Sequence, residues 1–152
     1  MTKLKQTNTF LVEIVIVILF FSLSVAVTLQ LFVSAHANST LSSEKNIALM
    51  RAQSVCEQIR EVDPGASESF EKKIEGCTLT EQNGSVGRYE VCFDKDWNIV
   101  NMQSAYLMTI EINSTQEESG LLINAAVSVT KDKNGVAQML TQLNTSHYLA
   151  QS

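Results

Sequence analysis

The feature that most constrains this chain is an apolar stretch near its N-terminus, Phe10–Val33, in which Glu13 is the one charged residue. A helix needs about 20 apolar residues to cross the hydrocarbon core of a bilayer, and this stretch is longer. Lys3 and Lys5 precede it, and the next basic residue is Lys45. The positive-inside rule therefore predicts a single span of the cytoplasmic membrane, with a cytoplasmic N-terminus and an exported C-terminal part.

Three interpretations of this stretch fit the sequence. In the first it is a secretory signal, since Ala35-His36-Ala37 fits the small-x-small cleavage pattern, although such apolar regions usually span roughly 7–15 residues. In the second it is a plain uncleaved anchor, with Glu13 reaching the cytoplasmic interface. In the third Glu13 has a partner. Cleavage after Asn8 would create a new amine on Thr9, and that amine would pair with Glu13 of a neighbouring copy.

The segment TFLVEIVIVILFFSLSVAV, which starts at Thr9, resembles the N-terminal segment of type IV pilins and of the pseudopilins of type II secretion and competence systems. The resemblance implies cleavage by a prepilin peptidase between Asn8 and Thr9, methylation of the new amine, and assembly into filaments. Phe10-Leu11-Val12-Glu13 matches the family's run into the acid, although Thr9 stands where the family usually has Phe or Met. Asn8 stands where the family has Gly, and the helix-interrupting Gly and Pro of major pilins are missing, which favours a minor pilin or pseudopilin.

An amphipathic helix is expected to follow the apolar stretch. Residues 34–62 contain neither Gly nor Pro, and Asp63-Pro64-Gly65 supplies a stop signal. Apolar residues recur at helical spacing along one face, at Leu41, Ala48, Ala52, Val55 and Ile59. The predicted organisation is a cytoplasmic leader at 1–8, a membrane and assembly helix at 9–34, an amphipathic stalk helix at 35–63 and an exported head at 64–152.

The head changes to an alternation with a period of two, which is typical of half-buried strands. Three segments show it, RYEVCF, AYLMTIEIN and INAAVSVT, and Asn134-Gly135 predicts a hairpin turn leading into VAQMLTQL. NSTQEESG is expected to be a loop between the second and third strands, and SESFEKKIE a short surface helix. The predicted fold class is α+β, with a long N-terminal helix packed on an antiparallel meander of about four strands. The pilin resemblance implies the same layout.

The three cysteines leave their pairing open, because an odd number cannot all form disulfides within one chain. Cys77 and Cys92 flank the turn-like EQNGSVG and are the first candidates for a disulfide across a hairpin. A bond from Cys56 to Cys77, or no bond at all, is also consistent with the sequence. Cys56 lies beside the helix stripe and is expected to be a buried small hydrophobe.

No pattern for catalysis, metal binding or cofactor binding is found in the sequence. His36 and His147 are isolated, no Cys pair has C-x-x-C spacing, and the six Gly are scattered. We therefore expect a protein that is not an enzyme and has no metal and no cofactor. FDKDWN is expected to be a polar turn with Trp97 packed beneath it. The net charge is −5, and such an acidic chain is not suited to bind nucleic acid directly.

The sequence favours a structural subunit, a minor pilin or pseudopilin of a type IV-like pilus, competence or type II secretion filament. Its expected partners are other pilin or pseudopilin subunits through the N-terminal helix, prepilin peptidase and the cytoplasmic membrane. The alternative is a single-pass anchored protein whose exported domain binds a ligand or a partner protein without forming filaments.

Overall fold

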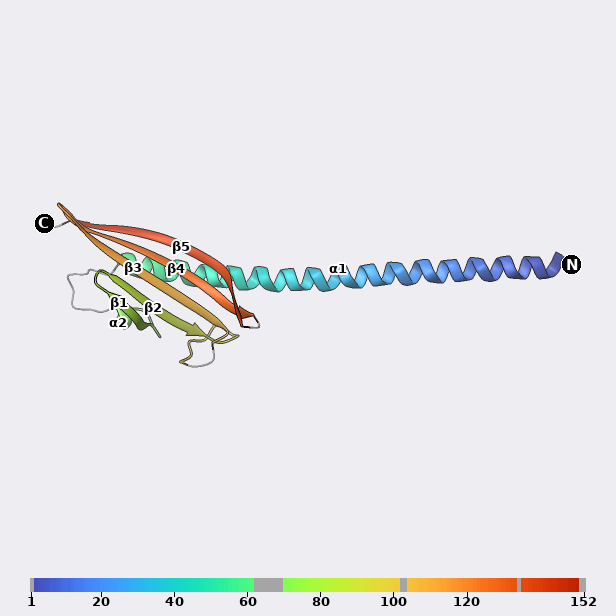
Figure 1. Ribbon diagram of the computed structural model, residues 1–152, viewed down its shortest axis with the longest axis horizontal. Helices are drawn as coiled ribbons and strands as arrows, with labels where there is room; N and C mark the ends of the chain where they lie inside the picture. Colours follow the sequence, from blue (N-terminus) through green and yellow to red (C-terminus); the bar gives the residue numbers. More distant parts are fainter. Residues whose placement is uncertain (1, 62–69, 102–103, 134, 151–152) are drawn as a thin grey trace. The chain divides into compact units, whose positions relative to one another are not determined.

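A computed structural model describes residues 2–61, 70–101, 104–133 and 135–150. The chain divides into two compact units, Met1–Ser43 and Glu44–Ser152. The helix α1, Thr2–Arg60, contributes residues to both units. The first unit holds only helix, whereas the second combines the last turns of α1 with a sheet (Figure 1).

The sheet of the second unit is antiparallel and five-stranded, with its strands in the order β1-β2-β3-β4-β5. Each strand therefore pairs with its neighbour in the chain, as expected for a meander (Figure 1). The elements after α1 are α2 Phe70–Lys73, β1 Thr78–Asn83, β2 Val86–Phe93, β3 Tyr106–Glu117, β4 Gly120–Lys133 and β5 Val136–Ala150.

The core of this unit lies between one face of the sheet and the apolar stripe of α1. Ala48, Ala52, Val55 and Ile59 are buried, which confirms the stripe predicted for the head-facing part of the helix. The alternating residues of the sheet are buried as well, namely Tyr106, Met108, Ile110 and Ile112 in β3, and Ile123, Ala125, Val127 and Val129 in β4. Each fully buried aliphatic side chain contributes about 1.5–3 kcal/mol through removal of apolar surface from water. The α+β class is confirmed.

Polar contacts at two points of α1 show its direction over the sheet. Glu44 bonds to Lys131, which pairs with Gln138 near the start of β5. Arg60 donates from Nε to Thr145 Oγ1 at 2.8 Å, further along the same strand. The segment Glu44–Arg60 therefore runs in the same direction as β5.

The prediction of about four strands is wrong, because β1 is a fifth. Its TLTEQN sequence shows no apolar alternation, and five of its six residues are exposed. This strand is held by the backbone ladder to β2, in which Thr78 lies opposite Glu90 and Asn83 opposite Val86. The turn within EQNGSVG is therefore shorter than predicted, because β1 runs to Asn83 and β2 begins at Val86. Gly84 lies in this turn with a φ of 60°.

The prediction of a loop at NSTQEESG is also wrong. β3 continues to Glu117, and its ladder to β4 is unbroken as far as the Glu117–Gly120 pair. The residues at this end of β3 are mostly exposed, so their sequence lacks the alternation of apolar and polar residues that a half-buried strand shows. Gly120 is required there, because a Cβ atom would collide with the backbone oxygen of Leu149 in β5.

Three other predictions overlap parts of the chain outside the described residues. α1 ends at Arg60, and the stop signal Asp63-Pro64-Gly65 lies outside the description. The predicted helix at SESFEKKIE is described only as α2, Phe70–Lys73, followed by the buried Ile74. Asn134 is likewise outside, whereas Gly135 has a φ of 79°, as a tight turn before β5 requires.

Candidate functional site

The apolar segment Phe10–Val33 is helical and exposed throughout within the structure. Phe10 is 61% exposed, Phe20 71% and Phe32 73%. By length and composition this helix can cross a membrane, and none of its most apolar part is buried. Since soluble core helices of such composition are covered by the rest of their protein, this segment is suited to lipid or to other helices.

Hydroxyl groups within the apolar segment are satisfied by the helix itself. Ser22 donates to the carbonyl oxygen of Ile18 at 2.8 Å, Ser24 to that of Phe20 at 2.9 Å, and Thr28 to that of Ser24 at 2.8 Å. These bonds allow polar side chains to enter hydrocarbon without an unpaired donor. The hydroxyls of this segment therefore need no neighbouring chain.

Glu13 differs from these hydroxyls. It lies about one turn after Thr9 and is exposed, and its carboxylate makes no hydrogen bond or ion pair with any residue that the structure describes. Phe10 is exposed one turn earlier, on the same side of the helix. The sequence-predicted processing and assembly residues, Asn8, Thr9, Phe10 and Glu13, thus lie within consecutive turns of α1.

A polar cluster of Glu44, Tyr106 and Lys131 joins α1 to the sheet near the start of the second unit. Lys131 Nζ lies 2.5 Å from Glu44 Oε1, with the two side chains 30% and 14% exposed. The Tyr106 ring lies beside the same pair, with Lys131 Nζ 5.6 Å from the centre of the ring. Burial, and then the Glu44 carboxylate, raise the pKa of Tyr106 to about 12.

This cluster borders a hollow of about 580 Å³. Its lining combines two lysines, two acids, one tyrosine and three small residues, namely Glu44, Lys95, Ser104, Ala105, Tyr106, Lys131, Asp132 and Gly135. Opposite charges are balanced in this lining, so it has no strong preference for an anion or a cation. Sequence reasoning did not find the cluster, because Glu44 and Lys131 are 87 residues apart and belong to no motif.

The FDKDWN segment forms a polar turn above an aromatic stack, as predicted. Asp94 Oδ1 accepts from the backbone N–H of Asp96 at 2.8 Å and of Asn98 at 2.9 Å. The bond from the Asn98 side chain is the largest cause that lowers the pKa of Asp94. Trp97 has a φ of 63° and is buried, with its ring 4.0 Å from that of Tyr106 and nearly parallel to it.

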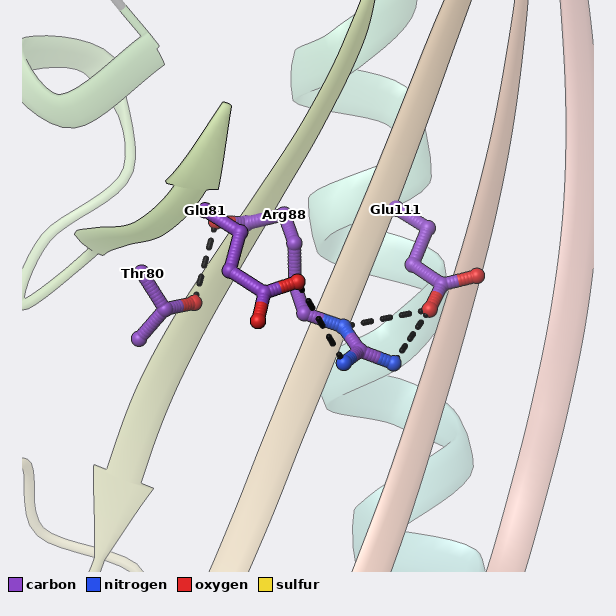
Figure 2. A network of polar contacts seen from close by, with 4 residues as sticks. All are labelled: Thr80, Glu81, Arg88 and Glu111. Carbon is purple, nitrogen blue, oxygen red and sulfur yellow. Dashed lines mark hydrogen bonds and ion pairs between the residues drawn. The ribbon is translucent and has the colours of Figure 1, made fainter. Parts of the chain in front are cut away.

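A polar row crosses β1, β2 and β3 on the sheet face away from the core. Figure 2 shows Arg88 between Glu81 and Glu111. Arg88 Nη2 lies 2.6 Å from the Glu111 carboxylate, and Arg88 Nη1 lies 4.0 Å from the Glu81 carboxylate. Thr80 donates to the Arg88 carbonyl oxygen at 3.1 Å. The hydrogen bond to Glu111 raises the pKa of Arg88. These partners are exposed, so the row aligns the short edge strand rather than forming a binding site.

The cysteines lie in three environments. Cys56 is buried, as predicted, and burial raises the pKa of its thiol. Cys77 and Cys92 are half-buried, and no disulfide joins any of the three here. Because Thr78 pairs with Glu90, the ladder does not place Cys77 directly opposite Cys92. A Cys77–Cys92 bond in the oxidised protein stays a prediction.

No metal-ligand cluster of three or more His, Cys, Asp or Glu occurs among the described residues. His36 is exposed in α1, and His147 lies in β5 opposite Ile123. Comparison with known proteins finds no matching protein-family model, no matching curated protein and no matching solved structure. The geometry of the chain itself therefore carries the functional argument.

Proposed function

We propose that this protein is a membrane-anchored structural subunit, a minor pilin or pseudopilin of a type IV-like pilus, competence or type II secretion filament. Its N-terminus lies in the cytoplasm and its head is exported. Subunits assemble through lateral packing of their Phe10–Val33 helices. The support is an apolar helix that its own protein leaves exposed, joined to a head with a separate core.

Glu13 is the observation that carries the proposal. A carboxylate in an apolar helix is costly in hydrocarbon, by about 2.5–3.5 kcal/mol at mid-depth, and marks a functional position. The hydroxyls of this segment bond to their own helix, whereas Glu13 has no partner among the described residues. A partner from another chain relieves this cost.

The partner that we propose is the amine of a neighbouring subunit. Cleavage between Asn8 and Thr9 by prepilin peptidase places a positive charge at the start of the apolar helix, only four residues before Glu13. Pairing of the Thr9 amine with Glu13 of a neighbour offsets the desolvation of both charges and sets the stagger of the two helices. Phe10 packs between them and excludes water from the pair.

Mass spectrometry of the mature N-terminus from native cells tests the processing step. We expect a chain that starts at Thr9 with a methylated amine. A start at Met1 or Thr2 would contradict the processing step and leave a plain anchor. A start at Asn38 would contradict the whole proposal, because the apolar helix would then be only an export signal.

Cross-linking within the membrane tests the assembly step. Wild-type chains should give a ladder of cross-linked copies through the apolar helix, and Glu13→Ala should reduce the ladder by about tenfold, the loss expected for one charged pair. Ser22→Ala is the matched control, since Ser22 bonds to its own helix and its loss should leave the ladder unchanged. An equal ladder in Glu13→Ala and wild type would refute the register role of Glu13.

The hollow beside Glu44 favours a second candidate function, a single-pass anchored domain that binds a ligand or partner protein without forming filaments. The hollow is about 580 Å³, within the range of small-molecule sites. The same cross-linking experiment separates the two functions, because this candidate requires that no ladder forms through the apolar helix.

A further inference from the structure

The two edges of the head sheet are built differently. β1 is a six-residue strand with Glu81 in it and a register shift between Leu79 and Glu81. Short length, charge and irregularity are the devices by which proteins discourage an edge strand from pairing with another chain. The β1 edge is therefore protected.

β5, at the opposite edge, lacks most of these devices. It has 15 residues, Val136–Ala150, without any charged residue, Pro or Gly. Strands are usually about 5–6 residues long. The one register shift of its ladder falls beside Leu140, and the pairing with β4 is regular from Thr141 to Ala150. Among the described strands β5 pairs with β4 alone, so alternate backbone N–H and C=O groups of its outer edge are available to an extended chain.

The side chains along this edge define the chemistry of a matching strand. On the outward face Gln142, Asn144 and Ser146 are exposed. On the helix-side face Leu143, His147 and Leu149 are half-buried, and Thr145, between Leu143 and His147 in this row, is buried and accepts from Arg60. A strand added to the edge continues both rows, so a matching strand alternates amide or hydroxyl residues with aliphatic residues and is uncharged.

We propose that the Thr141–Ala150 edge accepts an extended, uncharged segment of another exported polypeptide as a sixth strand. Backbone hydrogen bonds supply the affinity, and the two side-chain rows select for the alternation of aliphatic with amide or hydroxyl residues. This role belongs to the head, and it rests on the proposed function only in that the chain is anchored in one membrane and the head is exported.

The direction of α1 argues against a second copy of this chain as the occupant. Glu44–Arg60 runs in the same direction as β5, so antiparallel pairing of two β5 edges places the two Glu44 residues at opposite ends of the pair. In copies anchored in one membrane, α1 enters each head at its Glu44 end, and these ends all face the membrane. A copy related by translation presents β1 to β5 instead, and that edge is protected. A copy rotated about the strand direction has to pair β5 with β5 in parallel, which is the less stable ladder.

A binding experiment with the full chain in detergent micelles tests the proposal. The probe is a fluorescent peptide with the sequence of Leu121–Val129, LLINAAVSV, which has the alternation that β5 already accepts from β4. We expect wild-type protein to bind the peptide, and Gln142→Lys to weaken binding by about tenfold, because lysine is a natural edge protector. A peptide methylated on its backbone nitrogens should not bind, since it cannot donate to the edge.

Thr109→Lys is the matched control. Thr109, Ser128 and Gln142 lie in one row across the sheet, but Thr109 belongs to the central strand β3. This variant should bind the peptide as wild type does, and unchanged Trp97 fluorescence should confirm that both variants are folded. The proposal is overturned by absence of peptide binding to wild type, by equal binding to the two variants, or by equal binding of the methylated peptide. A homodimer cross-linked through Gln142→Cys, with the native cysteines replaced, would assign the edge to a second copy and overturn it as well.

Discussion

Two parts of the same helix, Phe10–Val33 and Glu44–Arg60, have opposite relations to the protein that contains them. The first is apolar on every side and none of it is buried, whereas the second has one apolar stripe, which the sheet covers. Polar groups follow the same division. The hydroxyls of the first part bond to their own helix and the Glu13 carboxylate bonds to no described residue, whereas Glu44 and Arg60 bond to the sheet.

The difference shows how the two parts of one helix can be suited to different environments, a folded head and a membrane or helical assembly. A stripe makes a helix part of a folded unit, while a uniformly apolar surface leaves it available to lipid or to other helices. Changes in the second part should therefore affect the stability of the head, and changes in the first part should affect insertion and assembly alone. The chain has one tryptophan, Trp97, which is buried in the head and reports its unfolding.

The largest expected effect is that of Ile59→Ala, which breaks the covered stripe. Ile59 is only 1% exposed, and loss of its side chain leaves a cavity against the sheet. We expect the free energy of unfolding of the head to fall by about 2–5 kcal/mol. Urea unfolding of the full chain in micelles, followed by Trp97 fluorescence, measures it. A loss below about 0.5 kcal/mol would mean that the stripe does not hold the head together.

A smaller effect is expected when the ion pair between Glu44 and Lys131, which links the start of Glu44–Arg60 to the sheet, is removed. Lys131→Met leaves the largely buried Glu44 carboxylate without its cation, and we expect the head to lose about 1–3 kcal/mol. Lys95→Met is the control, because Lys95 lines the same hollow and is exposed. The same urea titration applies, and equal losses in the two variants would show that the Glu44–Lys131 pair contributes nothing specific.

High pH should weaken the same link without a mutation. The folded pKa of Tyr106 is about 12 and its ordinary value is 10.0, so the folded head favours the neutral phenol. This contribution is complete below pH 10 and is lost as the pH rises toward 12. A tyrosinate absorbance titration should show one late phenol, which Tyr106→Phe removes. If all the tyrosines titrate together, neither burial nor the Glu44 carboxylate keeps Tyr106 neutral at high pH.

The smallest effect on the head is expected from the apolar part of the helix. Leu23→Ala and Glu13→Ala should each change the free energy of unfolding by less than about 0.5 kcal/mol, because neither residue is buried in the head. Urea unfolding and membrane cross-linking of the same samples would then separate stability from assembly. A large loss of head stability in either variant would contradict the division between the two parts of α1.

Local patterns in the sequence were enough to predict the elements that bury side chains. The Phe10–Val33 stretch, the stripe through Ala48, Ala52 and Ile59, and the alternation of β3 and β4 all depend on the period with which apolar residues recur. That period is set by the geometry of a helix or a strand. Glu13 was found in the same way, as a charge that interrupts an apolar pattern.

Only the tertiary structure decided the features that depend on another segment of the chain. β1 and the far end of β3 are strands because a neighbouring backbone pairs with them, and backbone pairing leaves no mark on side chains that remain in water. The cluster of Glu44, Tyr106 and Lys131 arises where the helix meets the sheet. The difference between a protected β1 edge and an open β5 edge followed only from the order of the strands, because β5 resembles any other strand until its place at the edge is known.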